Sequence, residues 1–384
     1  MRVAVGQAQA LDAREAAAQA ARQALEQIGR EPAVIALVMA SHHYPIQMVV
    51  NGLASVLSDV PLFGCSTLGE ISGGGCSQRS IVVALLCGDI QARAEWWPGY
   101  AEDSQAVARN LTEAFQLGRS NDVLLVAADG TNGDAQQLCA GLPVGDYRLF
   151  GCLAGGAVDL HRTYQIGGRK SGVNGLSAAL LTGEKLAVGI GQGHGWLPLE
   201  NYAPVTQSSG LWIKSVDQRS PAEFYAQWLG FSPDEWRVPP LSQLVRLYPL
   251  ALKAENGAPI VVRSPLCLDE VDGNLQMHAT IPEGSAVCLM VGSSERCLQA
   301  AEDAAHQALE KLGSAKPLLA LVFVDVAWQM LMEAQPASGI QAVRQIIGEN
   351  VPVIGGYTFG QVARGRQGAE FFNQNFSVML LAET

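Results

Sequence analysis

A repeated segment is the sequence feature that most constrains the fold of this chain. The run Gln23–Gly29 followed by Ala36–Val38 matches Gln307–Gly313 followed by Ala320–Val322 at an offset of 284 residues. Further along, a second pair of segments matches at an offset of 291: Pro61–Ile71 and Pro352–Val362. The change in offset indicates one short insertion between the two matches.

A third, weaker copy lies between these two, with Val123–Val126 followed by Leu149–Cys152. Such self-similarity indicates one supersecondary unit that is used three times. We expect the copies over about residues 1–90, 91–185 and 285–384. Each copy is predicted to contain, in order, a short strand, an Ala-rich helix, a strand, a second helix, a strand, a Gly-rich turn and a strand.

The first copy shows the pattern most clearly. Its long helix is bracketed by a capping pair, Asp12 and Glu15, and by Gly29 at its end. Apolar strand runs such as 81–86 suit a sheet covered by helices on at least one face. The fold class is therefore predicted to be α/β, with repeated units forming sheets covered by helices. The predicted strands are 2–7, 34–40, 60–65 and 80–87, and the predicted helices are 12–29 and 46–58.

Residues from about 196 to 285 break from the pattern and are predicted to form an insertion. They hold four of the seven tryptophans and ten of the 18 prolines. Ser220 and Glu223 form a capping box with proline at the first helical position, which predicts a helix over about 221–230. Strands are expected at 261–263, 276–278 and 286–289, separated by Gly-containing turns.

Charge and composition exclude several classes of protein. The net charge is −11, so the chain lacks the basic character that a nucleic-acid partner requires. No run of about 18 apolar residues predicts a membrane span, and the first residues lack the apolar core of a signal peptide. The eight cysteines are scattered without a Cys-x-x-Cys motif. We expect reduced, mostly buried thiols in a cytoplasmic protein.

Several motifs resemble the FIST family. Phe63–Ile71, Gly193–Pro198 and Pro221–Glu223 resemble its amino-terminal domain, which the resemblance places at residues 1–225. The motifs that resemble its carboxy-terminal domain, placed at 226–384, are Tyr248–Leu250, Arg263–Leu266, Pro282–Gly284, Gly355–Gly360 and Phe372–Phe376.

The resemblance implies a ligand-binding sensory module of signal transduction. Bacterial members of the family include hemoproteins that sense nitric oxide and regulate a histidine kinase or a cyclic-di-GMP enzyme. The resemblance thus implies haem as cofactor and one of these enzymes as partner. Three departures from the family pattern stand out. Gln361-Val362 replaces Glu-Ile, Phe372–Asn375 replaces His-Asn-Gln-Thr, and Val324–Ala327 stands where Cys-x-Gly-Arg is expected.

Haem requires an axial donor beside an apolar slot. His194 is the first candidate for that iron ligand, because Gly191, Gly193 and Gly195 around it let a backbone or a cofactor approach closely. Trp196 could line the apolar wall. His43 is the second candidate, since it follows a predicted strand. The structural alternatives are a histidine that caps its own glycine-rich turn and a plain turn at His43.

The loop after the third strand offers a second kind of site. Cys65, Ser66, Thr67 and Glu70 are predicted to bind a small metabolite such as an amino acid, in a protein without haem. The repeated segment supplies Tyr357 and Thr358 to an equivalent pocket, or else both loops only complete the fold. A Cys65 nucleophile with His43 lacks a third, orienting group, so we predict a sensor and not an enzyme.

Overall fold

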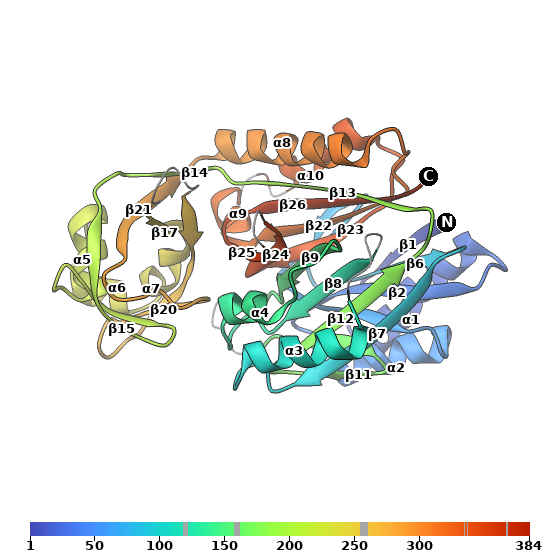
Figure 1. Cartoon of the computed structure of the whole chain (residues 1–384), viewed down its shortest axis with the longest axis horizontal. Coiled ribbons are helices and arrows are strands. Elements are labelled where there is room, and N and C mark those ends of the chain that lie inside the picture. The colour runs from blue at the N-terminus through green and yellow to red at the C-terminus, as the bar shows by residue number, and fades with distance from the viewer. Residues whose placement is uncertain (118–121, 157–161, 254–259, 334, 336, 366–367) are drawn as a thin grey trace.

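The computed structural model describes residues 1–117, 122–156, 162–253, 260–333, 335, 337–365 and 368–384. Figure 1 shows two parts: a body of three helix-covered sheets at the right, and an insertion of strands and short helices at the left. Both chain ends lie on the body, at the end remote from the insertion, where the Met1 ammonium group pairs with the Glu383 carboxylate. The α/β fold class is confirmed.

The first unit has the predicted elements, each within two residues of its expected bounds. Asp12 accepts a hydrogen bond from the Glu15 amide at the start of α1, and Gly29 ends that helix at φ 75°. The unit consists of β1 (Arg2–Ala8), α1 (Ala13–Ile28), β2 (Ala33–Ser41), α2 (Ile46–Leu57), β3 (Leu62–Thr67), β4 (Glu70–Ser72), β5 (Gly75–Ser77) and β6 (Ile81–Cys87).

The second unit follows the same element order, and the third follows it with one additional short helix, α9, after its second strand. The second comprises β7 (Gln91–Pro98), α3 (Ser104–Phe115), β8 (Val123–Ala128), α4 (Ala135–Gly141), β9 (Arg148–Leu153), β10 (Gln165–Gly168), β11 (Lys170–Gly172) and β12 (Gly175–Thr182). The third comprises β13 (Leu186–Gly193), α8 (Ser294–Leu312), β22 (Leu319–Asp325), α9 (Val326–Leu331), α10 (Ser338–Ile347), β23 (Val353–Thr358), β24 (Gly360–Arg364), β25 (Ala369–Phe372) and β26 (Phe376–Glu383).

The third unit begins earlier than the repeat predicts. Its first strand is β13, which pairs along its whole length with β26. The apolar run 286–292, where the third copy was expected to start, is instead a strand of the insertion sheet. The insertion therefore interrupts the unit between its first strand and its first helix. Local sequence could not reveal this, because strand pairing depends on partners far away in the chain.

Each unit donates a two-stranded hairpin to the sheet of another unit. The β10–β11 hairpin pairs with β3, the β24–β25 hairpin with β9, and the β4–β5 hairpin with β23. The resulting sheets have the orders β1-β6-β2-β3-β10-β11, β25-β24-β9-β8-β12-β7 and β13-β26-β22-β23-β4-β5. This cyclic exchange closes the three units into a ring and pairs strand edges that would otherwise be open.

The three sheets enclose one apolar core, and the helices cover their outer faces with further apolar clusters. At the centre, Cys65 Sγ lies 3.7 Å from Cys152 Sγ. The chain segments that follow β3, β9 and β23 cross there and are joined by three equivalent backbone hydrogen bonds. Their donor and acceptor pairs are Leu68 N to Tyr357 O at 3.0 Å, Gly155 N to Ser66 O at 2.8 Å and Phe359 N to Leu153 O at 3.0 Å.

The insertion forms its own sheet and its own apolar core. Its helix α5 (Pro221–Leu229) begins with the predicted capping box of Ser220 and Glu223. Its other elements are β14 (Trp196–Pro198), β15 (Ala203–Ser209), β16 (Trp212–Val216), α6 (Pro233–Arg237), α7 (Leu241–Leu244), a 3₁₀ turn (Val245–Leu247), β17 (Leu250–Leu252), β18 (Val261–Arg263), β19 (Pro265–Leu268), β20 (Leu275–Met277) and β21 (Ala286–Gly292).

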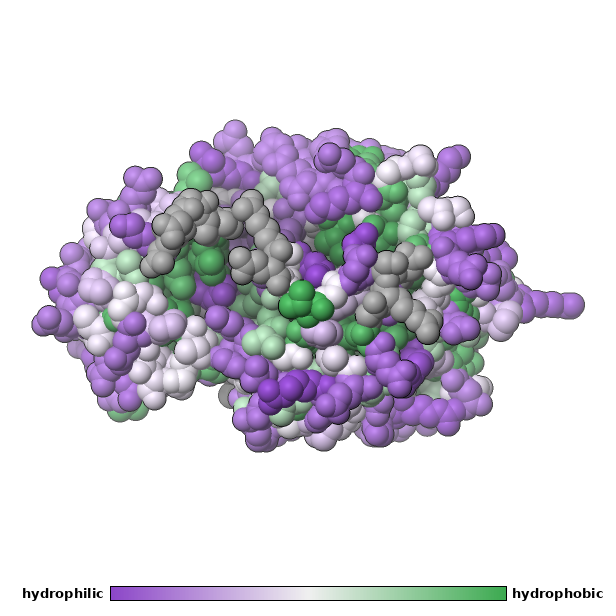
Figure 2. Space-filling model, in the orientation of Figure 1, coloured by the Kyte–Doolittle hydropathy of each residue, from purple (hydrophilic) through white to green (hydrophobic). Residues whose placement is uncertain are grey.

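The hydropathy of the surface differs between the outer face of α8 and the region beneath it. Figure 2 shows a hydrophilic outer face on α8 and apolar surface in the hollow beneath that helix. Among the described residues, no helix is both long enough and apolar enough to cross a membrane.

Candidate functional site

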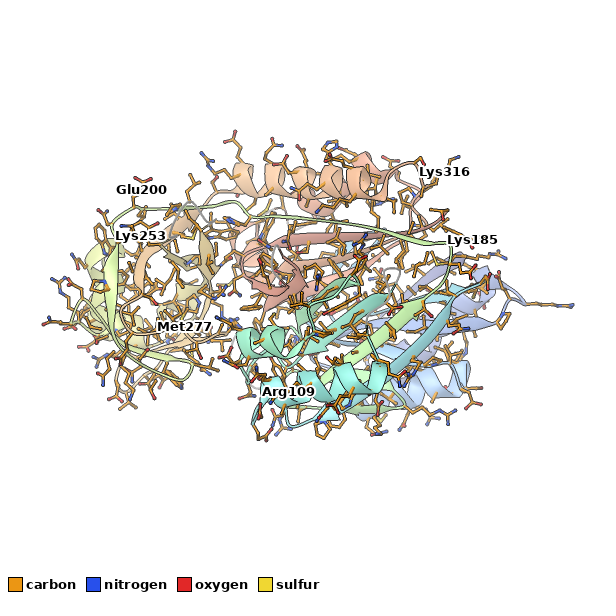
Figure 3. All side chains as sticks on the ribbon, in the orientation of Figure 1. Arg109, Lys185, Glu200, Lys253, Met277 and Lys316 are labelled. Atoms are coloured by element: carbon orange, nitrogen blue, oxygen red, sulfur yellow. The ribbon has the colours of Figure 1, made fainter. Side chains whose placement is uncertain are left out.

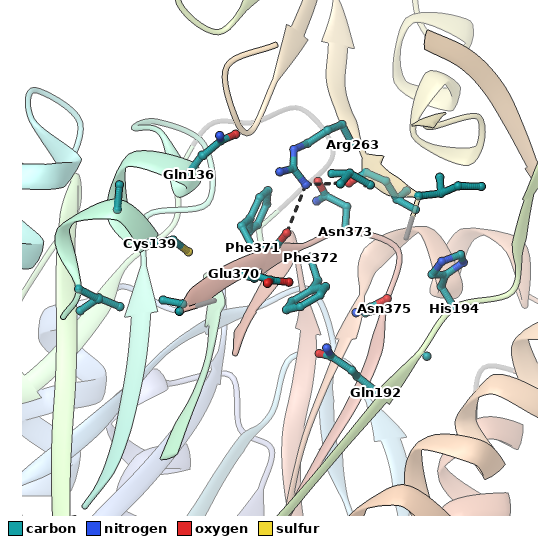
Figure 4. Close-up of a pocket in the computed structure, with 18 of the residues that line it drawn as sticks. Gln136, Cys139, Gln192, His194, Arg263, Glu370, Phe371, Phe372, Asn373 and Asn375 are labelled. Atoms are coloured by element: carbon teal, nitrogen blue, oxygen red, sulfur yellow. Dashed lines mark hydrogen bonds between the residues drawn. The ribbon is translucent and has the colours of Figure 1, made fainter. Parts of the chain in front are cut away.

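A cavity of about 640 Å³ lies where the insertion meets the three-sheet body. Its walls come from α4 and the loop after it, the end of β13, strand β18 of the insertion, and the β25 hairpin with its following turn (Figure 4). Ligand sites in proteins commonly have this volume and this position between substructures. The polar lining residues are Gln136, Gln192, His194, Arg263, Glu370, Asn373 and Asn375, and the largest apolar ones are Leu142, Val144, Ile260, Val261, Val262, Phe371 and Phe372.

His194, the first candidate for the iron ligand, does line this cavity. Its Nδ1 accepts a hydrogen bond from the Trp196 amide at 3.4 Å. The His194 side chain is exposed at the edge of the cavity, and partial desolvation by the surrounding chain lowers the pKa of its ring, which favours the neutral form. With Nδ1 acting as acceptor, the neutral ring carries its proton on Nε2. His194 is therefore suited to donate a hydrogen bond to a bound molecule.

Two of the three glycines around His194, Gly191 and Gly195, serve close packing, whereas Gly193 lines the cavity. A Cβ at Gly191 would lie 1.9 Å from the carbonyl oxygen of Ala304, and one at Gly195 would lie 2.4 Å from the amide nitrogen of Cys297. Both neighbours belong to α8. These glycines let β13 and the segment after it lie directly against the backbone of that helix.

Trp196 and His43, the other two residues predicted for cofactor binding, lie outside the cavity lining. The Trp196 side chain is fully buried, and its Nε1 donates to the Leu247 carbonyl at 3.0 Å. It also packs against Trp328, with ring centroids 6.1 Å apart. His43 is an exposed turn residue ahead of α2, and its ring lies 3.9 Å from that of His42. Trp196 thus helps to join the insertion to the body.

The residues predicted to bind a metabolite are all buried near the crossing point of the three units. Thr67 Oγ1 donates to Glu70 Oε1 at 2.7 Å, and the Ser80 amide and hydroxyl donate to Oε2 at 2.9 and 2.8 Å. The Ser66 hydroxyl accepts from the Tyr164 amide. These side chains are thus engaged with the protein itself.

The corresponding residues of the third unit are buried in the same way. Thr358 accepts a hydrogen bond from Gln361 Nε2 at 3.2 Å, and the Tyr357 side chain is 3 % exposed. Neither residue belongs to the cavity lining. Cys65 has no exposed surface and faces Cys152. This burial does not favour the catalytic alternative, in which Cys65 would attack a substrate.

Arg263 connects the two edge strands that border the cavity. Its Nη1 donates to the Val262 carbonyl at 3.0 Å and to the Phe371 carbonyl at 3.2 Å, so it links β18 of the insertion to β25 of the body (Figure 4). Burial lowers the pKa of the guanidinium to about 10, at which it still carries its charge at neutral pH. A ligand in the cavity would meet this cation at the joint between the two parts.

Sequence reasoning did not assign the run Phe372–Asn375 to the site, although three of its residues line the cavity. The signal was present, since this run departs from the family pattern by replacing histidine with Phe372. Figure 4 shows the Phe372 ring inside the cavity, near Glu370 and Gln192. The Phe372 ring therefore adds an apolar surface to the cavity wall.

The comparisons with known proteins agree with the motifs. Residues 34–219 match the FIST N domain and residues 221–364 match the FIST C domain. The chain belongs to the FIST family. The boundary between the two matches falls just ahead of α5, inside the insertion, so the family domains do not coincide with the three structural units.

No curated protein matches the chain. Two cyanuric acid hydrolases are loosely similar in structure. The one from A. caulinodans is 11 % identical, with a TM-score of 0.26 over 47 % of this chain and 70 % of that one. The other is 10 % identical, with a TM-score of 0.35 over 100 % of this chain and 99 % of that one. Phosphoribosylformylglycinamidine synthase II from Thermotoga maritima is 11 % identical, with a TM-score of 0.24 over 100 % and 72 %. Likenesses of this degree assign no activity.

Proposed function

We propose that this FIST protein is a sensor that binds a small polar metabolite, such as an amino acid, in the 640 Å³ cavity without haem. FIST domains are signal-transduction sensor domains that bind small ligands. The observation that carries the proposal is the cavity between the insertion and the three-sheet body. Its lining combines amide side chains, a neutral histidine, one arginine and one glutamate, which suits a ligand with both donors and acceptors.

The position of the cavity explains how binding becomes a signal. A ligand in the cavity contacts β18 of the insertion on one side and α4 and β25 of the body on the other. It therefore favours the position of the insertion in which both sides contact the ligand. The insertion joins the body through β14 and β21, which pair with each other, and β21 ends at Gly292, two residues before α8 begins. A displacement of the insertion is thereby passed directly to α8.

Haem is the cofactor that the family resemblance implies, and His194 is the residue that would hold it. Histidine ligands of metals usually donate their second ring N–H to an acceptor, which leaves the other nitrogen free for the metal. Here the second nitrogen, Nδ1, receives a hydrogen bond from the Trp196 amide. This arrangement does not favour iron at Nε2, and it supports the version of the proposal without haem and nitric oxide.

The proposed partner is a histidine kinase or a cyclic-di-GMP enzyme, on the basis of the family resemblance. In this proposal the chain performs no catalysis of its own. Its output is the changed position of the insertion and of α8, which a partner reads by contact. The outer face of α8 is hydrophilic (Figure 2), which suits a reversible contact better than a permanent one.

The test is a thermal-shift screen of small metabolites, amino acids included, followed by calorimetric titration of those that bind. Val144 is exposed at the cavity lining, so Val144→Trp should block the cavity without unfolding the protein. Val271→Trp is the matched control, because Val271 is equally exposed on the insertion but outside the lining. At a ligand concentration of about 100 Kd, the wild type and the control should gain about 2.7 kcal/mol of stability.

Two results would overturn the proposal. A ligand that binds Val144→Trp as tightly as the wild type binds somewhere other than the cavity. A Soret band that appears when haem is added, and that His194→Ala abolishes while the exposed-residue control His306→Ala retains it, would replace the metabolite by haem.

A further inference from the structure

A second, basic hollow adjoins the cavity. Its volume is about 340 Å³, and Gln192 lines both spaces, so the two are neighbours along β13. Three cations line the hollow: Arg148 at the start of β9, Lys311 near the end of α8 and Arg364 at the end of β24. A smaller space of about 180 Å³ continues along β13 and shares Arg148 and Lys311.

The concentration of positive charge is unusual for this chain. The protein has a net charge of −11, yet none of the described residues that line the hollow is acidic. Arg148 pairs with Asp146 at 4.0 Å, and both side chains are more than half exposed. A pair of this kind is screened by water and compensates little of the charge. The hollow therefore presents a local positive potential within an acidic protein.

The three cations retain unused donors. Lys311 Nζ donates to the Ile190 carbonyl at 2.7 Å, which occupies one of its three N–H bonds. The Arg364 guanidinium lies over the Tyr147 ring at 5.1 Å, so the ring holds it in place. Its Nη1 is buried and lacks a hydrogen-bond partner among the described residues. Such an unsatisfied buried donor is costly unless something outside the chain fills it.

The alternative explanation of this cluster is that the three cations are solvated surface side chains that bind no common ligand. Convergence argues against it, because the three side chains come from three separate elements and line one hollow. The fixed guanidinium of Arg364 argues against it too, since a merely solvated arginine would turn its nitrogens to water. Arginine and lysine together are the usual donors to phosphate oxygens.

We infer that Arg148, Lys311 and Arg364 form a phosphate-binding subsite, and that the sensed metabolite carries a phosphate group there while its remainder reaches past Gln192 into the cavity. This inference rests on the proposed function only for the second part of the ligand. The subsite itself requires just the three cations. Gln192 lines both spaces, and its buried Oε1 has no hydrogen-bond partner among the described residues, so it is available to accept from the linking part of the ligand.

The experiment uses inorganic phosphate as the probe for the subsite, titrated calorimetrically into the full chain at constant ionic strength. The wild type should bind phosphate, and Arg148→Gln, Lys311→Gln and Arg364→Gln should each weaken binding by about tenfold or more. Lys316→Gln is the matched control, because Lys316 is exposed beyond the end of α8 (Figure 3) and lies outside the lining. It removes the same charge and should leave the affinity unchanged.

Absence of phosphate binding at millimolar concentration would overturn the inference. An equal loss of affinity in Lys311→Gln and Lys316→Gln would also overturn it, because net charge alone would then explain binding. The cavity is tested separately by Val144→Trp, which should leave phosphate binding intact. If a metabolite binds and the three cation variants bind it as tightly as the wild type, the cavity proposal stands and the subsite fails.

For the complete ligand, the screen pairs each phosphate monoester with its dephosphorylated form. The ester should bind more tightly than both the free phosphate and the dephosphorylated form, and Arg364→Gln should remove its advantage over the latter. If the ester binds no more tightly than inorganic phosphate, the hollow binds only the free ion. That result would overturn the inference that one ligand occupies both spaces.

Discussion

Replacing Glu70 by glutamine should abolish a specific part of the pH dependence of stability. Burial raises the pKa of the Glu70 carboxyl from 4.5 to about 7, against the opposing effect of hydrogen bonds from Thr67 and Ser80. Because the folded protein holds this proton more tightly than the unfolded chain, the stabilising contribution is present at low pH and is lost as pH rises. The full shift corresponds to about 3 kcal/mol, of which about 2.5 kcal/mol falls between pH 5 and pH 8.

The structure also indicates that the substitution will be tolerated. Glu70 is the first residue of β4, and the corresponding strands of the other two units carry Gln165 and Gln361 near their starts. A glutamine Oε1 can keep both hydrogen bonds from Ser80. Its amide can donate to the Thr67 hydroxyl, which then turns towards the Ala40 carbonyl at 3.5 Å.

The measurement is urea denaturation of wild type and Glu70→Gln at pH 5 and pH 8. Both proteins share every other titrating group, so the difference between their free energies of unfolding isolates Glu70. We expect Glu70→Gln to gain about 2.5 kcal/mol over the wild type between pH 5 and pH 8. A difference that is the same at both pH values would show that Glu70 ionises in the folded protein as readily as in the unfolded one, which would refute the argument.

Two further predictions concern the centre of the body. Gly155→Ala would place Cβ 2.1 Å from the Tyr357 carbonyl oxygen and should lower the free energy of unfolding, measured by urea denaturation, by about 3 kcal/mol or more. In the control Gly73→Ala, the new Cβ meets nothing within 4 Å, so stability should not change. Equal stabilities of the two variants would contradict the close crossing of the units. Iodoacetamide should label the half-buried Cys267 well before the fully buried Cys65, as followed by peptide mass spectrometry, and equally fast labelling would show that Cys65 is accessible to a substrate.

Local structure could be predicted from the sequence because its determinants are local. Asp12, Glu15 and Gly29 bracket α1 through hydrogen bonds to nearby backbone and through one left-handed residue, and all of these effects act within a few residues. The capping box at Ser220 and Glu223 works in the same way. The alternation of apolar strands and amphipathic helices therefore predicted the α/β class and the bounds of the first unit.

Pairing and site geometry could not be predicted in the same way. Whether the β4–β5 hairpin pairs with β3 or with β23 depends on contacts across almost 300 residues of sequence, and nothing in the hairpin itself distinguishes them. The glycines near His194 suggested an open approach for a ligand, but Gly191 and Gly195 lie against α8, while Gly193 lines the cavity. His194 was found because it is a histidine within a glycine-rich run, whereas Arg263 and Phe372 come from segments that meet only in the folded chain.

The three-unit plan itself explains why the cavity lies away from the crossing point. Gly64, Gly151 and Gly355 occupy equivalent places in β3, β9 and β23, and a Cβ at any of them would lie 2.4 Å or less from an atom of the neighbouring strand. A larger residue at any of these three positions would disrupt the packing of the three-sheet body. These positions therefore cannot change to accommodate a ligand. The insertion interrupts the third unit, which therefore differs from the other two at this place. Side chains at its joint with the body lie outside this repeated packing, so a binding site can vary there without disrupting the three-sheet body.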